Sequence, residues 1–412
     1  MPAIDFIYFD AGGGHRSAVT ALREVIAEQR RPWETRLVNL QEVLDEMDPF
    51  RKLTGVRAQD VYNGMLNQGW TLGSAQLKTV YHGLIRLSHS AQVARLERHW
   101  LRSRPDLAVS VIPHFNRALA ESLRNTHPGV PFVTILTDIA DSPPHFWIER
   151  QMQHLVCGSA RAVEQARRLG HPKARIWQTS GMIVHPRFYA QPEIDRRAER
   201  QRLGLHPDLP TALLLFGGQG SRAMLRIVQR MDAARAGVQA IALCGRNTEL
   251  AAGLLRLHLR MPLHVVGFTA GIPYYMRLSD FLIGKPGPGC VSEAAVMGLP
   301  MIVESNSWTM PQERYNPQWI LDQNFGLVVD GFSRVAPAVQ ELLRPANYRQ
   351  FKDALAAHRN RAVFEIPEIL DAILRESAAA LPRNRLTAPI AASAGTRAVN
   401  ELPRRTAADT AA

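Results

Sequence analysis

The chain has 412 residues, of which 46% are hydrophobic and 21% charged, and its formal net charge is +12. This composition is typical of a folded protein long enough for two domains, and it excludes collagen-like and wholly disordered chains. We expect neither a membrane span nor an export signal. The three scattered cysteines, Cys157, Cys244 and Cys290, match no zinc spacing and indicate a reducing compartment.

An apolar run at residues 4–9 is expected to form the first strand of a sheet. A turn with Gly12, Gly13 and Gly14 follows it, and a helical pattern begins directly afterwards. Three glycines let the backbone pass close to a ligand, and His15 would face that ligand from the start of the helix. An exposed histidine of a first helical turn is the plainer alternative, but the glycine-rich setting favours a functional His15.

A second strand is expected at residues 35–40, and a long insertion at residues 48–104 follows it. Between Arg51 and Arg104 there are nine Lys and Arg but only two acidic residues. A basic surface attracts nucleic acid and anionic lipid alike. Residues 77–100 have a helical pattern that either packs on its own domain or lies against a membrane. Its predicted apolar face consists of Leu77, Val80, Tyr81, Leu84, Ser88, Ala91 and Ala94.

Further short strands are expected at residues 107–112, 131–137 and 154–157. Parallel sheets bind ligands outside the carboxyl ends of their strands, which makes Asp138 a candidate site residue. A helix-capping aspartate is the commoner explanation for such a residue. Residues 181–185 close this half, and a polar stretch up to about residue 210 has the composition of a link between domains.

The second half repeats the alternation, with strands expected at residues 211–216, 238–243, 264–267, 281–283 and 301–303. Residues 218–223, which begin at Gly218, fit the pattern G-x-G-x-x-A of dinucleotide-binding turns. That function requires an acidic residue after the next strand, where the chain has Arg246 instead. A nicotinamide cofactor is therefore disfavoured.

Residues 284–300 contain the most informative turn of the chain. Gly287, Pro288 and Gly289 form a tight turn that opens a helix at Cys290, and the unpaired amides of such a turn suit a phosphate. Glu293 lies one turn further on, where a carboxylate can reach ribose hydroxyls. Taken alone, this motif would favour an ordinary strand-turn-helix unit without a ligand.

A polar segment after the last of these strands contains Gln312, Glu313 and Asn316. Amides and a carboxylate beside a phosphate-binding helix could bind sugar hydroxyls, although a capped helix start is the simpler interpretation. One further helix is predicted at residues 348–377. The remaining residues, 378–412, lack periodicity and are predicted to be disordered.

Together these motifs resemble those of monogalactosyldiacylglycerol synthases and processive diacylglycerol glycosyltransferases. More distantly, they resemble the peptidoglycan N-acetylglucosaminyltransferase that makes lipid II (glycosyltransferase family 28). The resemblance runs from about residue 4 to residue 374. It rests on Gly12-Gly13-Gly14-His15-Arg16, Tyr62-Asn63, Gly69-Trp70-Thr71, Thr137-Asp138, Gly181, Pro186-x-Phe188, Gly217-Gly218, Cys244-Gly245-Arg246-Asn247, Val266-Gly267-Phe268, the block from Lys285 to Pro300, and Gln312-Glu313 with Asn316.

The resemblance implies an α/β protein of GT-B fold, in which two Rossmann-like domains with parallel sheets face one another across a cleft. The expected division is an acceptor-binding domain at 1–185, a linker at 186–209, a UDP-sugar-binding domain at 210–377 and a tail at 378–412. Two departures from the family pattern are Pro286, where the family usually has alanine, and the order Pro113-His114, where plant members have His-Pro.

The resemblance also implies roles for particular residues. His15 would be the general base, Asp138 a second catalytic residue, and Gly12, Gly13 and Gly14 an acceptor or phosphate loop. The UDP-sugar would contact Gly267 and Phe268 with its uracil, Glu293 with its ribose, and Gly287, Pro288, Gly289 and Cys290 with its diphosphate. The sugar would face Gln312, Glu313 and Asn316, while Gly218 and Arg246 would complete the donor site.

The expected activity is inverting transfer of a hexose, galactose or glucose, from a UDP-sugar to diacylglycerol, without cofactor or metal. The basic residues at 51–104 would hold the enzyme on an anionic membrane, at the cytoplasmic face of the cell membrane. A soluble UDP-sugar epimerase or hydrolase of the same fold is the first alternative. A non-enzymatic, basic nucleic-acid-binding protein is the second, and the dominance of glycine turns argues against it.

Overall fold

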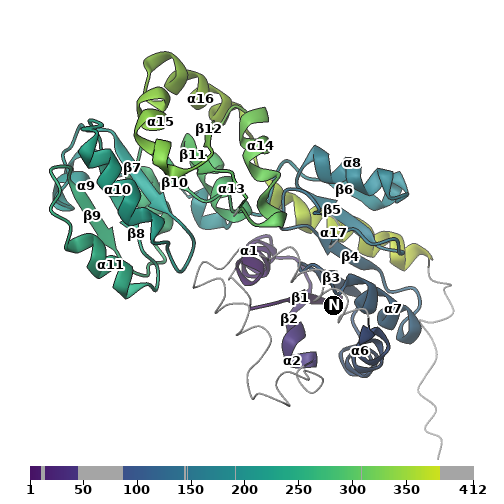
Figure 1. The fold of residues 1–412 in the computed structure, drawn as a ribbon. Helices are drawn as coiled ribbons and strands as arrows, with labels where there is room; N and C mark the ends of the chain where they lie inside the picture. The colour runs from purple at the N-terminus through teal and green to yellow at the C-terminus, as the bar shows by residue number, and fades with distance from the viewer. Residues whose placement is uncertain are drawn as a thin grey trace, which may run out of the picture.

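Two six-stranded parallel sheets form the framework of the protein, and Figure 1 shows them in two separate lobes. The computed structural model describes residues 1–10, 14–44, 87–142, 145, 147–190, 192–307 and 309–380. The strand order is β2-β1-β3-β4-β5-β6 in the first sheet and β12-β11-β10-β7-β8-β9 in the second. The predicted α/β class with two Rossmann-like sheets is confirmed.

The first sheet contains β1 (Ala3–Tyr8), β2 (Glu34–Asn39), β3 (Leu107–Ser110), β4 (Phe132–Ile135), β5 (His154–Cys157) and β6 (Ile176–Gln178). Its main helices are α1 (Gly14–Glu28), α2 (Leu40–Leu44), α6 (His89–Ser103), α7 (Asn116–Thr126) and α8 (Ala160–Arg168). Every residue of β1, β3, β4 and β5 is buried, as expected for short apolar strands covered on both faces. The sequence analysis did not predict β6, whose three residues are too few to show a pattern.

The second sheet contains β7 (Thr211–Leu215), β8 (Gln239–Leu243), β9 (Leu263–Val266), β10 (Phe281–Gly284), β11 (Met301–Glu304) and β12 (Gly326–Val329). Its helices are α10 (Ala223–Ala233), α11 (Thr248–Leu255), α12 (Ile272–Leu278), α13 (Pro288–Val296), α14 (Asn316–Asp322), α15 (Val335–Leu342) and α16 (Pro345–Ala357). Strand β12 was also missed by the sequence analysis. The strand order reverses between β7 and β10, so the turns after these two strands flank the position where open parallel sheets bind ligands.

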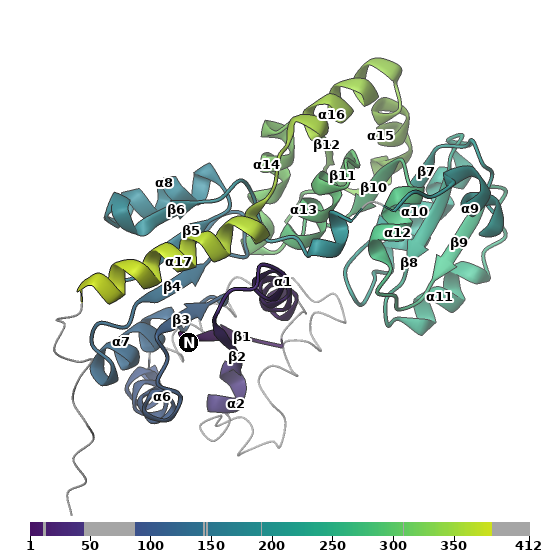
Figure 2. The same cartoon turned by 180° about the vertical axis from the view of Figure 1, so that it is seen from behind.

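The last helix, α17 (Ala362–Ala380), packs on the first sheet rather than the second (Figure 2). Its residues Val363, Ile366, Leu370 and Ile373 are buried in the same core as α1. The predicted boundary, which placed residues up to 377 in the second half, was therefore wrong for this helix. An apolar face at helical spacing shows that a helix is covered, but it does not show which sheet covers it.

The predicted single helix at residues 348–377 is interrupted at Asn360. The side-chain amide of Asn360 is buried and donates a 2.9 Å hydrogen bond to the carbonyl of Met182, and its Oδ1 accepts one of 3.1 Å from the amide of Ala362. The bond to Met182 ties the chain to the end of its first half at the point where it returns to the first lobe. Helix α17 continues to Ala380, so the predicted disorder was wrong for residues 378–380, and residues 381–412 lie outside the described residues.

The buried face of α6 also differs from the predicted one. Ala91 and Ala94 are exposed, whereas Val93, Leu96 and Trp100 pack into the first core. Trp100 donates a 2.8 Å hydrogen bond from Nε1 to Oγ of Ser122 on α7. The larger apolar side chains bury more surface than the alanines, which explains why they determine how the helix is rotated. The other residues of the predicted face, except Ser88, lie outside the described residues.

The segment that joins the lobes has structure of its own. It includes the 3-10 turn η3 (Pro186–Phe188) and helix α9 (Arg196–Arg202). Arg200 is buried and donates hydrogen bonds of 2.9 Å to the carbonyl of Leu278 and 2.7 Å to Oδ2 of Asp280. The predicted linker therefore ends with a helix that belongs to the second lobe. No helix in the described ranges is both long enough and apolar enough to cross a bilayer.

Candidate active site

His15 lies in the first turn of α1, at the carboxyl edge of the first sheet. Its Nδ1 is 3.3 Å from Oγ1 of Thr137, and its ring lies 6.0 Å from the Trp147 ring, centroid to centroid. Burial lowers the pKa of His15 to about 4, although a hydrogen bond with the backbone of Val111 acts in the opposite direction. The imidazole is therefore neutral near pH 7 and retains a lone pair that can accept a proton.

Asp138 follows β4 and is next to Thr137, as the sequence analysis expected. Its Oδ2 accepts a 2.8 Å hydrogen bond from Nε1 of Trp147. The ring of Trp147 is buried and contacts both the Asp138 carboxylate and the His15 imidazole. The side chain hydrogen-bonded to His15 is that of Thr137, and Asp138 is linked to the histidine through Trp147.

The described part of the chain after β4 holds Trp147 in place around the buried carboxylate of Asp141. That carboxylate accepts hydrogen bonds from the amides of Trp147 (3.1 Å) and Ile148 (3.3 Å), and it lies 3.0 Å from Nδ1 of His145. Gln165 on α8 binds the backbone of Asp141 in both directions. Asp141 therefore has a structural role, as the organiser of the loop.

The same loop crosses to the second lobe. Oγ of Ser142 donates a 3.2 Å hydrogen bond to the carbonyl of Pro311, which begins the 3-10 turn η4 (Pro311–Glu313). Ile139 packs in a core cluster with α12, α13 and α14 of the second lobe. The structure thus brings the His15 environment and the predicted sugar-binding segment together.

Helix α13 begins at Pro288, with Gly287 as its N-cap and no side chain capping it. Proline has no N–H, so the first-turn amides that can meet a ligand are those of Gly289 and Cys290. A Cβ placed on Gly289 would have no atom within 4 Å, which means that open space lies in front of this turn. The predicted phosphate site therefore has both the donors and the room that a phosphate needs.

Cys290 contributes its backbone rather than its thiol. Its Sγ is 4.0 Å from the carbonyl oxygen of Leu215, and burial raises the pKa of the thiol far above its usual range. A thiol that stays protonated is a poor nucleophile, so Cys290 is not a reactive cysteine.

Glu293 lies in the second turn of α13, beside the linking segment. Burial raises the pKa of its carboxyl to about 7, and the positive charge of Arg187 on η3 opposes this shift. The guanidinium of Arg187 lies 5.5 Å from the ring centroid of Phe188. A carboxyl that is half protonated near pH 7 can both donate and accept hydrogen bonds, as a ribose diol requires.

The three residues predicted to face the sugar differ in exposure. Glu313 on η4 is buried, and its Oε1 lies 3.9 Å from Nζ of Lys285. The neighbouring Gln312 is partly exposed. Asn316 has no exposed surface, and its Nδ2 donates a 2.7 Å hydrogen bond to the carbonyl of Pro286. Asn316 therefore holds the turn before α13, and its contact with the sugar stays a prediction.

The turns after β7, β8 and β9 form the other side of the predicted donor site. The amide of Arg246 donates a 2.9 Å hydrogen bond to the carbonyl of Gly218. A Cβ on Gly245 would lie 2.1 Å from that same carbonyl oxygen, so only glycine allows the two turns to approach this closely. The guanidinium of Arg246 stacks 4.7 Å from the ring centroid of Phe268, which follows exposed Gly267 and is itself 65% exposed. An exposed aromatic ring in this position suits a nucleobase.

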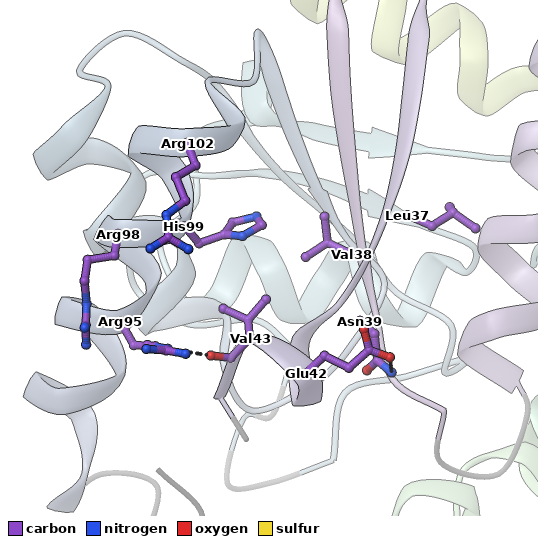
Figure 3. A pocket seen from close by; sticks show the side chains of 9 residues that line it. All are labelled: Leu37, Val38, Asn39, Glu42, Val43, Arg95, Arg98, His99 and Arg102. Atoms are coloured by element: carbon purple, nitrogen blue, oxygen red, sulfur yellow. Dashed lines mark hydrogen bonds between the residues drawn. The ribbon is translucent and has the colours of Figure 1, made fainter. Parts of the chain in front are cut away.

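A basic cavity of about 360 Å³ lies on the first lobe, between β2, α2 and α6 (Figure 3). Its positively charged lining consists of Arg95, Arg98 and Arg102, with His99 among them. Figure 3 shows Arg95 reaching Val43, whose carbonyl accepts a 3.0 Å hydrogen bond from Nε of the arginine. The arginines of this cavity belong to the described part of the predicted basic segment, residues 87–104. Residues 51–86, together with Gly12 and Gly13 of the predicted phosphate loop, lie outside the described residues, while Gly14 begins α1.

Two residues of the site were absent from the sequence-based predictions. Trp147 gave no motif signal, since it lies nine residues after Asp138 in an irregular loop. Lys285 belongs to the motif at 285–300, but its side chain was assigned no role. A basic residue directly before a phosphate-binding turn could have been recognised as a possible anion ligand.

The second half of the chain matches a known family model. The model of the glycosyltransferase family 28 C-terminal domain matches residues 212–362. The chain is 27% identical over 392 residues to the chloroplastic monogalactosyldiacylglycerol synthase of Spinacia oleracea, and the match covers 89% of this chain and 72% of the spinach protein. It is 26% identical over 390 residues to synthase 1 of Arabidopsis thaliana, over 89% and 70% of the two chains.

Solved structures share the fold. The chain is similar to MurG of Acinetobacter baumannii, with a TM-score of 0.60 and 11% identity over 91% of this chain and all of that one (100%). It is also similar to a UDP-GlcNAc 2-epimerase of Neisseria meningitidis, with a TM-score of 0.56 and 12% identity over 91% and 100% of the two chains. These similarities confirm the GT-B architecture. Because an epimerase has this fold as well, the fold alone does not determine the type of reaction.

Proposed function

We propose that the chain, which has a GT-B fold and whose residues 212–362 match the C-terminal domain of glycosyltransferase family 28, transfers galactose or glucose from a UDP-sugar to diacylglycerol. The relatives at 24–27% identity are synthases of monogalactosyldiacylglycerol, which supports both the lipid acceptor and a hexose donor. The product would be a membrane glycolipid.

One observation carries the proposal. The loop after β4 contacts His15 through Thr137 and Trp147, and it also reaches the turn that carries Gln312 and Glu313 through Ser142. A proton acceptor and a candidate donor site from different lobes therefore meet at one loop. A group transfer needs this arrangement, because the acceptor and the donor must be held at the same point.

The proposed chemistry is a single in-line displacement. Neutral His15 accepts the proton of the acceptor hydroxyl while its oxygen forms a bond to the anomeric carbon of the sugar. The bond from that carbon to the β-phosphate oxygen breaks at the same time, and the electron pair remains on the UDP. A single displacement inverts the anomeric configuration. The first-turn amides of α13 stabilise the charge that develops on the leaving phosphate.

The acceptor lipid lies in a membrane, and the first lobe has features suited to membrane contact. Arg98 and Arg102 on α6 are exposed, and Leu87 and Leu101 nearby in sequence are 86% and 56% exposed. Cations together with exposed apolar side chains allow a peripheral protein to bind an anionic bilayer reversibly. We propose that this surface faces the membrane that contains the diacylglycerol, at the cytoplasmic face of the cell membrane.

Incubation of the protein with diacylglycerol in phosphatidylglycerol vesicles and a panel of labelled UDP-sugars tests the proposal. We expect labelled glycolipid from UDP-galactose or UDP-glucose, of opposite anomeric configuration to the donor. Absence of lipid product with every hexose donor would contradict the proposal. Nuclear magnetic resonance of UDP-GlcNAc incubated with the enzyme alone checks the epimerase alternative, for which we expect no change of the sugar.

A further inference from the structure

Lys285 occupies the point where two glycine turns of the candidate donor site meet. A Cβ placed on Gly217 would lie 3.6 Å from Cε and 3.9 Å from Nζ of Lys285, and one placed on Gly287 would lie 3.7 Å from the same Cε. The end of the lysine side chain is thus next to the turn after β7 and the turn that opens α13. These turns flank the position where the strand order of the second sheet reverses.

The ammonium group of Lys285 is only loosely held. Its described ionic partner is Glu313, whose Oε1 is 3.9 Å away, at the long end of the range for an ion pair. The lysine side chain is 45% exposed and the glutamate side chain 10% exposed. An ammonium has three donors, so this one can turn toward a ligand and still remain near the carboxylate.

From this placement we infer that Lys285 is the cationic ligand of the donor's diphosphate, and that Glu313 holds its ammonium between the two turns while the site is empty. The inference rests on the proposed function, since it requires a nucleoside diphosphate sugar as the donor. The amides of Gly289 and Cys290 supply dipoles, and Lys285 supplies the full positive charge that backbone groups lack.

The inferred role extends to the chemical step. When the bond from the anomeric carbon to the β-phosphate oxygen breaks, that oxygen keeps the electron pair and gains negative charge. A cation beside it stabilises the transition state more than the bound donor, so Lys285 contributes to kcat as well as to binding. The Glu313 carboxylate, which remains near the ammonium, has further lone pairs that can accept a hydrogen bond from a sugar hydroxyl.

Binding of UDP and of uridine to the full-length protein, without acceptor, tests the inference. We expect Lys285→Met to weaken UDP binding about 10- to 100-fold in calorimetry. Uridine lacks phosphates, so its affinity, measured by saturation-transfer difference resonance, should change less than about twofold. Lys285→Arg should recover part of the UDP affinity, because it restores the charge with a different shape.

Lys352→Met is the matched control. Lys352 donates a 2.5 Å hydrogen bond to the carbonyl of Gly298, just after the C-terminal end of α13. The variant therefore removes a lysine that contacts α13 at the end opposite to the proposed phosphate site. We expect no change in the ratio of UDP to uridine affinity. Two results would overturn the inference in a wild-type protein that binds UDP. Either Lys285→Met binds UDP as tightly as wild type, or the variant loses affinity for UDP and for uridine to the same extent. If wild type binds no UDP, the proposed function fails as well.

Discussion

Nδ1 of His15 lies 3.3 Å from Oγ1 of Thr137, although 122 residues separate them in the chain. The contact joins the start of α1 to the residue pair that follows β4, across the neighbouring strands β1, β3 and β4. A hydrogen bond to one ring nitrogen of a histidine helps to determine how the ring is oriented. Thr137 is therefore a positioning residue for the proposed base.

Substitution of Thr137 by valine, which keeps the shape of the side chain but removes its hydroxyl, should lower kcat about tenfold and leave the affinity for UDP unchanged. Thr137→Ser retains a hydroxyl and should restore most of the activity. Steady-state kinetics of both variants, with calorimetry of UDP binding, provides the measurement. Equal activity of the valine and serine variants would show that the hydroxyl does not position His15.

The variant His15→Ala should lower transfer by about 10²–10⁴-fold, the usual contribution of a positioned base. UDP affinity should remain nearly intact, because the donor site lies in the other lobe. His258→Ala, which removes an exposed histidine from the second lobe, is a control that should keep full activity. A loss of UDP affinity as large as the loss of transfer would refute the assignment of His15 as the base.

For Glu293→Ala we expect a larger rise in the KM for the UDP-sugar than fall in kcat. The proposed contact with ribose is the same in the bound donor and in the transition state, so it affects binding more than chemistry. The measurement is a donor titration at saturating acceptor. A large loss of kcat at unchanged KM would show that Glu293 acts in the chemical step instead.

Glu293 should also make stability depend on pH. Its carboxyl has a pKa of about 7 in the folded protein, against 4.5 as the unperturbed value. Between these values the folded protein holds a proton that the unfolded chain has lost, so the free energy of unfolding falls as pH rises through this window. Glu293→Gln should therefore be more stable than wild type at pH 8, by about 1–3 kcal/mol.

This difference should shrink as the pH approaches 4.5, where both proteins are uncharged at this position. Calorimetric unfolding of both proteins at pH 5, 6.5 and 8 provides the measurement. A difference that stays constant over this range would mean that Glu293 is ionised in the folded protein at every pH tested.

Charge reversal of the two exposed α6 arginines, Arg98→Glu with Arg102→Glu, should release the protein from phosphatidylglycerol vesicles. Each cation near an anionic bilayer contributes about 1 kcal/mol, so loss of the pair weakens binding by roughly 30-fold or more. The measurement is sedimentation with vesicles at moderate salt.

The matched control for this pair is Arg256→Glu with Arg260→Glu, which makes the same change in net charge on exposed residues of the second lobe. The control should still pellet with the vesicles, and both double variants should bind UDP like wild type. If the α6 variant pelleted as well as wild type, the arginines of α6 would be a solvated surface without a role in membrane contact.

Much of the fold could be predicted because its signals are local. Apolar runs of four to six residues, each followed by a turn and a helical pattern, indicate parallel sheets. The carboxyl ends of parallel strands share one edge, so the glycine turns containing Gly218, Gly245 and Gly287 could be expected to lie near one another. Strand β6 was missed because its three residues carry too little pattern, and β12 was missed as well.

The candidate site could be predicted less completely. The turn at Gly287 and the carboxylate of Glu293 follow from a strand-turn-helix motif that is contiguous in sequence. The roles of Asn316 and Trp147 depend on which atoms surround them. A polar residue after a strand can face a ligand or a neighbouring carbonyl, and the buried bond from Asn316 to Pro286 shows the second outcome.

The sequence alone determined that this chain forms two parallel α/β halves with glycine turns at their ligand-binding edges. Strand and helix periodicity and the conformational needs of turns act between near neighbours, so they can be recognised in a linear chain. Only the tertiary structure decided that α17 covers the first sheet, that Thr137 and Trp147 meet His15, and that Lys285 lies between two turns. Those outcomes depend on which distant surfaces bury the most apolar area and leave the fewest unpaired polar groups, and no local pattern encodes that choice.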